Sequence, residues 1–143
     1  MVKILVSLGS NIYSKQNIDR ARRMLAYYFS DVVFTPSIIT TANDENYSFP
    51  FRNVLAIFHS DLPSEEIVQK LKMIEFAMGR QPRDKDTGKV IIDIDLLQYG
   101  DEILRPDDYE RAYVQALLTR LIDRSIVQSC HRFYPFHRFQ FFY

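Results

Sequence analysis

Two aspartates lie inside a run of the chain that is otherwise built to be buried. The run VIIDIDLLQYG spans residues 90–100, and its length and apolar composition are typical of a core strand. Side chains alternate between the faces of a strand, so Asp93 and Asp95 should share one face, opposite the isoleucines that enter the core. Their carboxylates would lie about 6–7 Å apart. Like charges this close need a positive partner, so the run predicts a divalent metal site.

The segment before this strand is rich in cations. It reads RQPRDKDTGK over residues 80–89, and its cations are Arg80, Arg83, Lys85 and Lys89. Flexible cations beside a metal held by carboxylates are suited to phosphate oxygens. The combination therefore favours phosphoryl or nucleotidyl transfer. The alternative is a structural role, in which the two aspartates only form ion pairs with Arg80 or Arg111.

The order of the periodic segments predicts the fold. In chain order we expect strand 3–8, helix 14–30, strand 31–41, strand 51–60, helix 64–78 and then the aspartate strand. This β-α-β-β-α-β order predicts an α+β, ferredoxin-like fold, in which an antiparallel sheet is covered on one face by two helices. Ser14 is expected to cap the first helix. A further helix is expected over about 107–126.

Length and composition narrow the class of protein. The 143 residues suit one domain, predicted over 1–130. Charge is balanced at 18 basic and 18 acidic residues, which favours neither nucleic acid nor an anionic membrane as partner. The single cysteine excludes an internal disulfide, and no apolar run is long enough for a membrane span, so a cytoplasmic location is expected. The aromatic tail at 131–143 should dock on the sheet, add an edge strand or mediate self-association.

Several motifs carry a resemblance to a known family. They are GSN at 9–11, the strand around Asn53, IEFAMGR at 74–80 and above all IDIDLLQYG at 92–100. On these motifs the chain resembles the 6-hydroxymethyl-7,8-dihydropterin pyrophosphokinases (HPPK), over roughly residues 3–118. The resemblance implies a ferredoxin-like fold and transfer of diphosphate from ATP to the hydroxymethyl group of a reduced pterin, a step of folate biosynthesis. It also implies two Mg²⁺ ions as cofactors.

The resemblance assigns roles by position. Asp93 and Asp95 match the metal-binding pair, and Arg80 and Arg111 match further catalytic positions. The nucleotide-binding candidates, taken from the resemblance and the basic segment together, are Glu75, Arg83, Lys85 and Lys89. The pterin-binding candidates are Thr41, Ala42, Phe51, Asn53 and Tyr113. Among these, Phe51 and Tyr113 would stack on the pterin ring while Asn53 reads its polar edge.

The main departures from the family pattern fall on the ATP side, although Ala42, on the pterin side, stands where the family usually has proline. Val90 stands where the family has an arginine just before the aspartate strand, and ILRPDDYERAYVQALL at 103–118 lacks the family's proline-histidine motif. Lys89 and Arg105 are the nearest cations. An alternative hypothesis is therefore a non-catalytic homologue that binds a pterin or a nucleotide.

Overall fold

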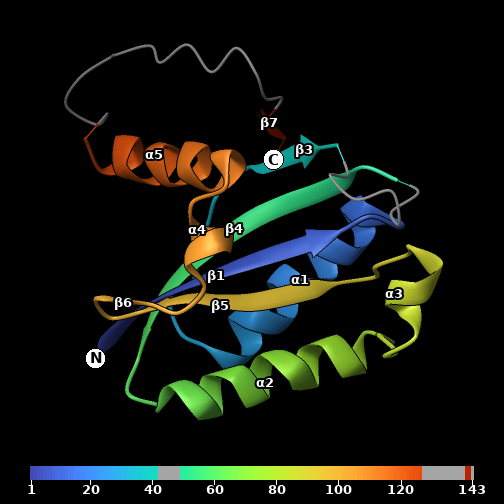
Figure 1. The fold of residues 1–143 in the computed structure, drawn as a ribbon. Helices are drawn as coiled ribbons and strands as arrows, with labels where there is room; N and C mark the ends of the chain where they lie inside the picture. The colour runs from blue at the N-terminus through green and yellow to red at the C-terminus, as the bar shows by residue number, and fades with distance from the viewer. Residues whose placement is uncertain (42–48, 127–140, 143) are drawn as a thin grey trace.

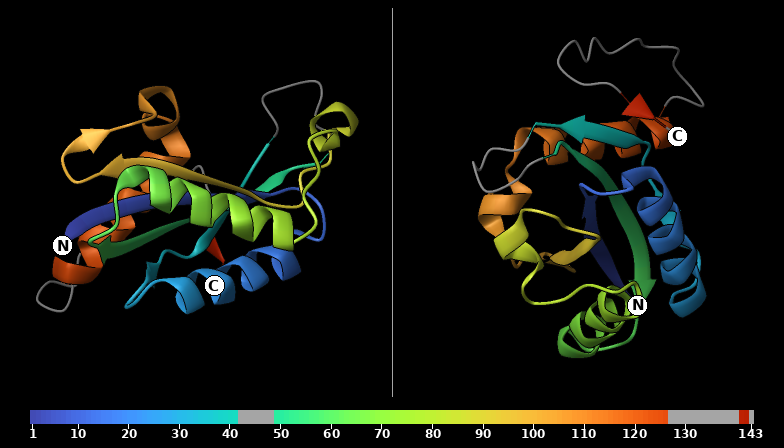
Figure 2. Two further views of the ribbon diagram at one scale, coloured as in Figure 1. Left: turned by 90° about the horizontal axis from the view of Figure 1, so that it is seen from below. Right: turned by 90° about the vertical axis from the view of Figure 1, so that its right-hand side faces the viewer.

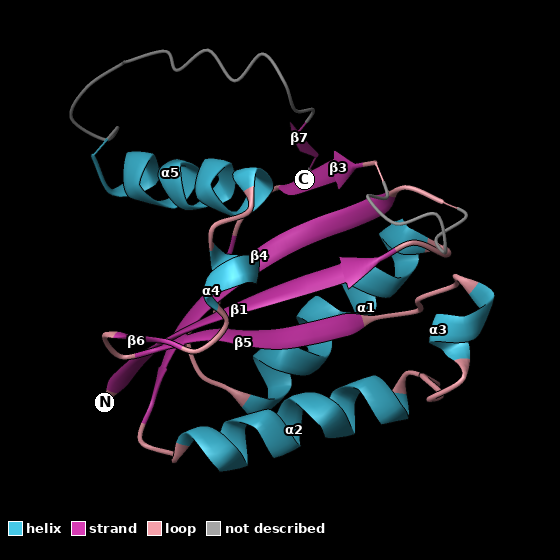
Figure 3. Ribbon diagram, viewed as in Figure 1, coloured by secondary structure: helices cyan, strands magenta, loops and turns pink. Residues whose placement is uncertain are grey.

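The computed structural model describes residues 1–41, 49–126 and 141–142. Its elements, shown in Figures 1 and 3, are β1 (Val2–Ser10), α1 (Ser14–Tyr28), β2 (Val33–Phe34), β3 (Ser37–Thr40), β4 (Phe51–Ser60), α2 (Ser64–Ala77), α3 (Asp84–Thr87), β5 (Asp93–Tyr99), β6 (Glu102–Ile103), α4 (Pro106–Tyr109), α5 (Ala112–Ile126) and β7 (Phe141–Phe142). The predicted α+β, ferredoxin-like order is confirmed.

The strands form one antiparallel sheet with β1 at its centre. The order is β6-β5-β1-β4-β3-β7, and β2 pairs with β4 beside β3. Strand β1 pairs with β4 along its whole length, from Val2 opposite Ser60 to Ser10 opposite Arg52. Helices α1 and α2 cover one face of the sheet, and α5 lies on the other face (Figures 1 and 2). The helix-free part of this second face is therefore where β5 and β1 can meet ligands.

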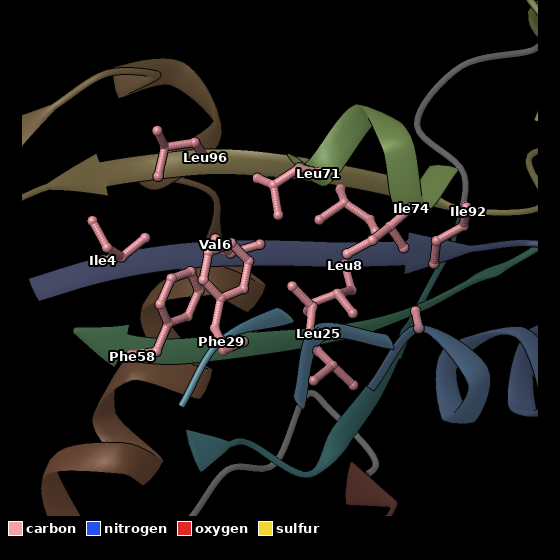
Figure 4. Packing of buried hydrophobic residues seen from close by; sticks show 14 of the residues in the cluster. Ile4, Val6, Leu8, Leu25, Phe29, Phe58, Leu71, Ile74, Ile92 and Leu96 are labelled. Atoms are coloured by element: carbon pink, nitrogen blue, oxygen red, sulfur yellow. The ribbon is translucent and has the colours of Figure 1, made fainter. Parts of the chain in front are cut away.

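The main core lies between the sheet and helices α1 and α2. Alternate residues of β1 and β5 enter it, and the labelled side chains of Figure 4 show how they interlock: Ile4, Val6, Leu8, Leu25, Phe29, Phe58, Leu71, Ile74, Ile92 and Leu96. Burying each such side chain contributes about 1.5–3 kcal/mol relative to leaving it exposed. The alternation expected for the aspartate strand is thus present, and it places the aspartates on the face away from this core.

The prediction of one continuous strand over residues 31–41 is wrong. The segment splits into β2 and β3 at Pro36, which has no N–H to give to a sheet. Thr35 bridges the break, because its backbone N–H donates to the carbonyl of Leu55 at 2.9 Å and its Oγ1 accepts from the N–H of Leu55 at 2.9 Å. Both short strands therefore still pair with β4.

Two expectations about helix ends are also corrected. The N-cap of α1 is Tyr13, in the left-handed region at φ 41°, and no side chain caps the helix; Ser14 instead accepts from Nε of Arg52 at 3.4 Å. The helix expected at 107–126 is two helices, α4 and α5. The turn between them is tied by an ion pair of 3.2 Å between Arg111 and Asp108.

Only part of the aromatic tail lies among the described residues. Phe141 and Phe142 of β7 pair with Ile38 and Ser37 of β3, which is the edge-strand alternative. Residues 131–140 and 143 lie outside the described part, so the domain boundary at 130 and self-association stay predictions. Across the described ranges, none of the helices combines the length and apolarity needed to cross a membrane.

Candidate active site

One row of residues across the sheet brings the predicted metal and pterin residues together. In the β5-β1-β4 register, Asp93 lies opposite Gly9, and Gly9 lies opposite Asn53. Neighbouring strands are about 4.8 Å apart, so the Cα atoms of the outer two residues are about 10 Å apart. Because Gly9 has no side chain, the surface between the aspartate and the asparagine is left uncovered. A Cβ atom at Gly9 would lie 3.4 Å from Oδ1 of Asn53 and 3.7 Å from Cδ1 of Phe51.

The two aspartates differ in their electrostatic surroundings. Burial, followed by the charge of Asp93, raises the pKa of Asp95 to about 6, although Arg105 opposes the shift. Burial would also raise the pKa of Asp93, but the hydrogen bond and charge of Arg80 outweigh it and hold that pKa below its ordinary value. The two neighbouring carboxylates therefore differ: Asp93 has a strong cationic partner, and Asp95 has a weak one.

Arg80 is fixed beside Asp93 by a buried glutamate. Gly79, at φ 95°, turns the chain after α2, so the N–H of Arg80 donates to the carbonyl of Glu75 at 3.1 Å. The guanidinium then donates Nη1 to Oε2 of Glu75 and, at 2.7 Å, to Oδ1 of Asp93. Glu75 is only 3 % exposed. The sequence placed this carboxylate on the apolar side of its helix, and the structure supplies the partners that its burial requires.

Glu75 also satisfies the edge of the sheet. Its Oε2 accepts from the backbone N–H of Ile94 at 2.9 Å, and its Oε1 accepts from Nζ of Lys72 at 3.1 Å. Strand β6 pairs only with Gln98 and Tyr99, so it does not reach this end of β5. Glu75 therefore takes the place of a neighbouring strand, and its position is set as much by β5 as by Arg80.

A second set of charges lies on the other side of the aspartate pair. Nη1 of Arg105 donates to Oδ1 of Asp95 at 3.2 Å, and its Nε donates to Oδ2 of Asp108 at 2.7 Å. Nη2 of Arg111 lies 3.2 Å from Oδ1 of the same Asp108. Of the ion pairs in the structural alternative, the one with Arg80 is formed at Asp93, whereas none with Arg111 is formed in the described part of the chain. Arg105 takes that place at Asp95.

The predicted pterin residues gather on the same face of the sheet. Asn53 is buried, and its Nδ2 donates to Oγ1 of Thr40 at 2.9 Å and to the carbonyl of Ile38 at 3.3 Å. These bonds direct Oδ1 towards Gly9. Phe51, on the same strand, and Tyr113, at the start of α5, are half-buried. Of the other two pterin-binding candidates, Thr41 is exposed and Ala42 lies outside the described residues.

The basic segment contacts the end of β1 through Asn11. The side chain of Asn11 donates to the carbonyl of Gly88 at 2.8 Å and accepts from the N–H of Val90 at 2.6 Å. Its backbone N–H donates to the carbonyl of Val90 at 3.0 Å. This clamp was not predicted, because its only signal in the sequence is an asparagine two residues after Gly9, at a strand end. Thr40 was missed as well, with no signal beyond a polar residue in a strand.

Arg83 and Lys89, two further cations of the basic segment, lie apart from the aspartates. Arg83 and Lys89 are exposed, and no ion pair joins either of them to an aspartate of β5 within the described residues. Lys85 lies in α3. Val90 is buried, at 5 % exposure, so no charge reaches the site from that position. Among the cations whose side chains the structure describes, Arg80 contacts Asp93 and Arg105 contacts Asp95.

The donor set suits magnesium better than zinc. In the described ranges no group of three or more His, Cys, Asp and Glu side chains comes together as a metal site, which a structural zinc ion would need. Magnesium is usually held by one or two carboxylates, with water and substrate phosphates as its other ligands. Asp93 and Asp95 fit this pattern.

Comparison with known proteins points to one family. A family model described as 7,8-dihydro-6-hydroxymethylpterin-pyrophosphokinase (HPPK) matches residues 5–123. Among curated proteins, the "Folate synthesis bifunctional protein" of Chlamydia muridarum is 31% identical over 106 residues, which cover 69% of this chain and 23% of that protein. Its namesake in Chlamydia trachomatis serovar D is 27% identical over 135 residues, or 82% of this chain and 30% of that protein. The chain thus spans less than a third of these relatives.

Proposed function

The chain belongs to the HPPK family, whose model covers most of its length, and we propose that it transfers diphosphate from ATP to 6-hydroxymethyl-7,8-dihydropterin for folate biosynthesis. The observation that carries the proposal is the row Asp93, Gly9, Asn53. In this row the Cα atom of Asp93, a carboxylate suited to a metal and its phosphates, is about 10 Å from that of Asn53, a buried amide suited to a flat heterocycle. Transfer between two substrates needs both sites on one face.

On the phosphate side, Asp93 and Asp95 would hold Mg²⁺, and Arg80 keeps Asp93 ionised and oriented. Magnesium bound there would neutralise phosphate charge and align the β-phosphorus with the attacking hydroxyl. Arg83, Lys85, Lys89 and Arg111 are the proposed further cations for ATP. Glu75 would act through Arg80, which it fixes. Positioning and charge neutralisation suffice for this chemistry, so the protein need supply no covalent nucleophile.

On the pterin side, Asn53 would read the polar edge of the ring through its amide, with Thr41 and Ala42 alongside. Its Nδ2 is bonded to β3, so Oδ1, which faces Gly9, is the atom directed at a ligand. Phe51 and Tyr113 would stack on the ring, each contributing about 1 kcal/mol beyond simple burial.

The direct test is AMP release. Purified chain supplied with ATP, Mg²⁺ and 6-hydroxymethyl-7,8-dihydropterin should release AMP in step with diphosphorylated pterin, as followed by chromatography. Omitting the pterin should abolish AMP formation, because water is not the intended acceptor. Absence of AMP with all three present would refute the proposal, and pterin binding without AMP would identify a binding protein instead.

Substitution of Gly9 tests the uncovered surface. Gly9→Val should weaken pterin binding by at least about tenfold, because the branched side chain would stand between Asn53 and Asp93 where the ring must lie. Valine suits a strand, so β1 should still form. The measurement is calorimetric titration with the pterin alcohol, in the presence of Mg²⁺ and α,β-methylene-ATP.

The matched control is Gly9→Ala, whose Cβ meets its neighbours at ordinary contact distances. It should retain most of the pterin affinity. Equal pterin affinity in wild-type protein and Gly9→Val would show that the pterin binds elsewhere.

A further inference from the structure

Arg105 is bound to the candidate metal site at one end and anchored at the other. Its Nη1 donates to Oδ1 of Asp95 at 3.2 Å, and its Nε donates to Oδ2 of Asp108 at 2.7 Å. The side chain is 50 % exposed. It comes from the segment between β6 and α4, on the opposite side of the aspartate pair from Arg80. The site therefore has a cation on each side.

The two arginines are held very differently. Arg80 is 15 % exposed, and leaving its place would strip a buried glutamate of its main partner, which is costly. Arg105 can leave Asp95 at little cost, because its other bond remains and water can solvate the freed guanidinium. Arg80 is thus a fixed part of the site, whereas Arg105 is exchangeable.

A divalent cation at Asp95 would compete with Arg105 for the same carboxylate. Two cations on one carboxylate repel each other, so Nη1 would be released while Nε stays on Asp108. The guanidinium would then remain beside the metal, facing whatever anion the metal brings. A planar guanidinium matches two phosphate oxygens better than any other side chain does.

We propose that Arg105 is a phosphate-binding residue. When Mg²⁺ binds, its guanidinium leaves the carboxylate of Asp95 and binds a phosphate group of the nucleotide instead. This rests on the proposed function, and it assigns to the phosphates a cation from the segment between β6 and α4. Asp108 would serve as the pivot. Asp108 also forms an ion pair with Arg111 at 3.2 Å. One carboxylate therefore binds the guanidinium groups of both Arg105 and Arg111.

The exchange predicts effects of opposite sign for one substitution. Arg105→Ala should bind Mg²⁺ alone about threefold more tightly, because a competing cation is gone. The same variant should bind α,β-methylene-ATP, at saturating Mg²⁺, at least about tenfold more weakly, because a charge-assisted contact is lost. Both affinities would be measured by calorimetry on the full chain, with circular dichroism as the check on folding.

Two further variants sharpen the comparison. Arg23→Ala removes the same charge from an exposed position on α1, across the sheet, and controls for net charge. Arg105→Lys keeps the charge but loses the planar fork, so Mg²⁺ affinity should stay near the wild-type value while analogue binding falls. A residue that only supports the fold would move both affinities in the same direction.

Changes of the same sign in Arg105→Ala, or changes no larger than those of Arg23→Ala, would overturn the proposal. The outcome is separable from the proposed function. Opposite shifts in a protein that releases no AMP would refute pyrophosphoryl transfer and leave the Arg105 exchange standing. Wild-type protein that binds neither Mg²⁺ nor the analogue would refute both.

Discussion

Asp95→Asn should abolish AMP release and, at pH 8, make the metal-free protein more stable. The pKa of Asp95 is raised from 3.8 to about 6, first by burial and then by Asp93. At pH 8 the ionised carboxylate therefore costs stability, by up to about 3 kcal/mol at 1.36 kcal/mol per pKa unit. Asparagine has a similar shape and no charge. Urea denaturation in the presence of a chelator would measure the gain.

The pH dependence of this gain follows from the sign of the shift. A carboxyl group with a raised pKa binds its proton more tightly in the folded state, so its favourable contribution is complete below pH 3.8 and lost as pH rises through 6. The stability difference between Asp95→Asn and wild type should therefore be small near pH 4 and largest above pH 7. A difference that is constant over this range would contradict the assignment.

Asp93→Asn is the matched control, and it should behave in the opposite way. Arg80 holds the pKa of Asp93 below its ordinary value, against the effect of burial, so the ionised form is favoured in the folded state. Neutralising it should lower stability at pH 8. Both variants should lose AMP release, so only the stability measurement distinguishes the two aspartates.

Glu75→Ala should cost about 3–5 kcal/mol of stability and most of the activity. It would leave Arg80 with Asp93 as its only carboxylate partner among the described residues and remove the acceptor of the Ile94 N–H. Removing one partner of a buried ion pair costs about this much, and here the N–H of Ile94 also loses its acceptor. Urea unfolding at pH 7.5 would measure the loss.

Two variants calibrate that measurement. Glu75→Gln keeps an acceptor for the N–H of Ile94, so its cost should be smaller, about 1–3 kcal/mol. Glu66→Ala, at an exposed position near the start of the same helix, should stay within about 0.5 kcal/mol of wild type. A loss below about 1 kcal/mol in Glu75→Ala would mean that Asp93 and water replace the contacts of Glu75.

Sequence periodicity predicted the parts of this fold that depend on burial. The alternation in β5 placed the aspartates on the face away from the isoleucines, and the helical spacing around Glu75 predicted a buried carboxylate in need of a partner. Both follow from local geometry. The break at Pro36 was missed because most of the surrounding residues favour strand, and the two hydrogen bonds between Thr35 and Leu55 keep the interrupted segment on β4.

The charged partners of the site were harder to predict, because turns decide them. Arg111 was expected near the aspartates, but the turn between α4 and α5 directs it to Asp108. Arg105 reaches Asp95 only because the chain reverses after β5. The clamp by Asn11 joins positions 79 residues apart. No spacing pattern along the chain reports such contacts.

The hydrogen bond from Ile94 to Glu75 has a consequence for solubility. An exposed strand edge is a template on which another chain can add a strand, and proteins protect such edges with charges or covering elements. Here a helix side chain takes the N–H that a foreign strand would use. Variants at Glu75 could therefore self-associate, and low activity in a crude extract would reflect lost protein as well as lost chemistry. Activity per folded monomer is the quantity to compare.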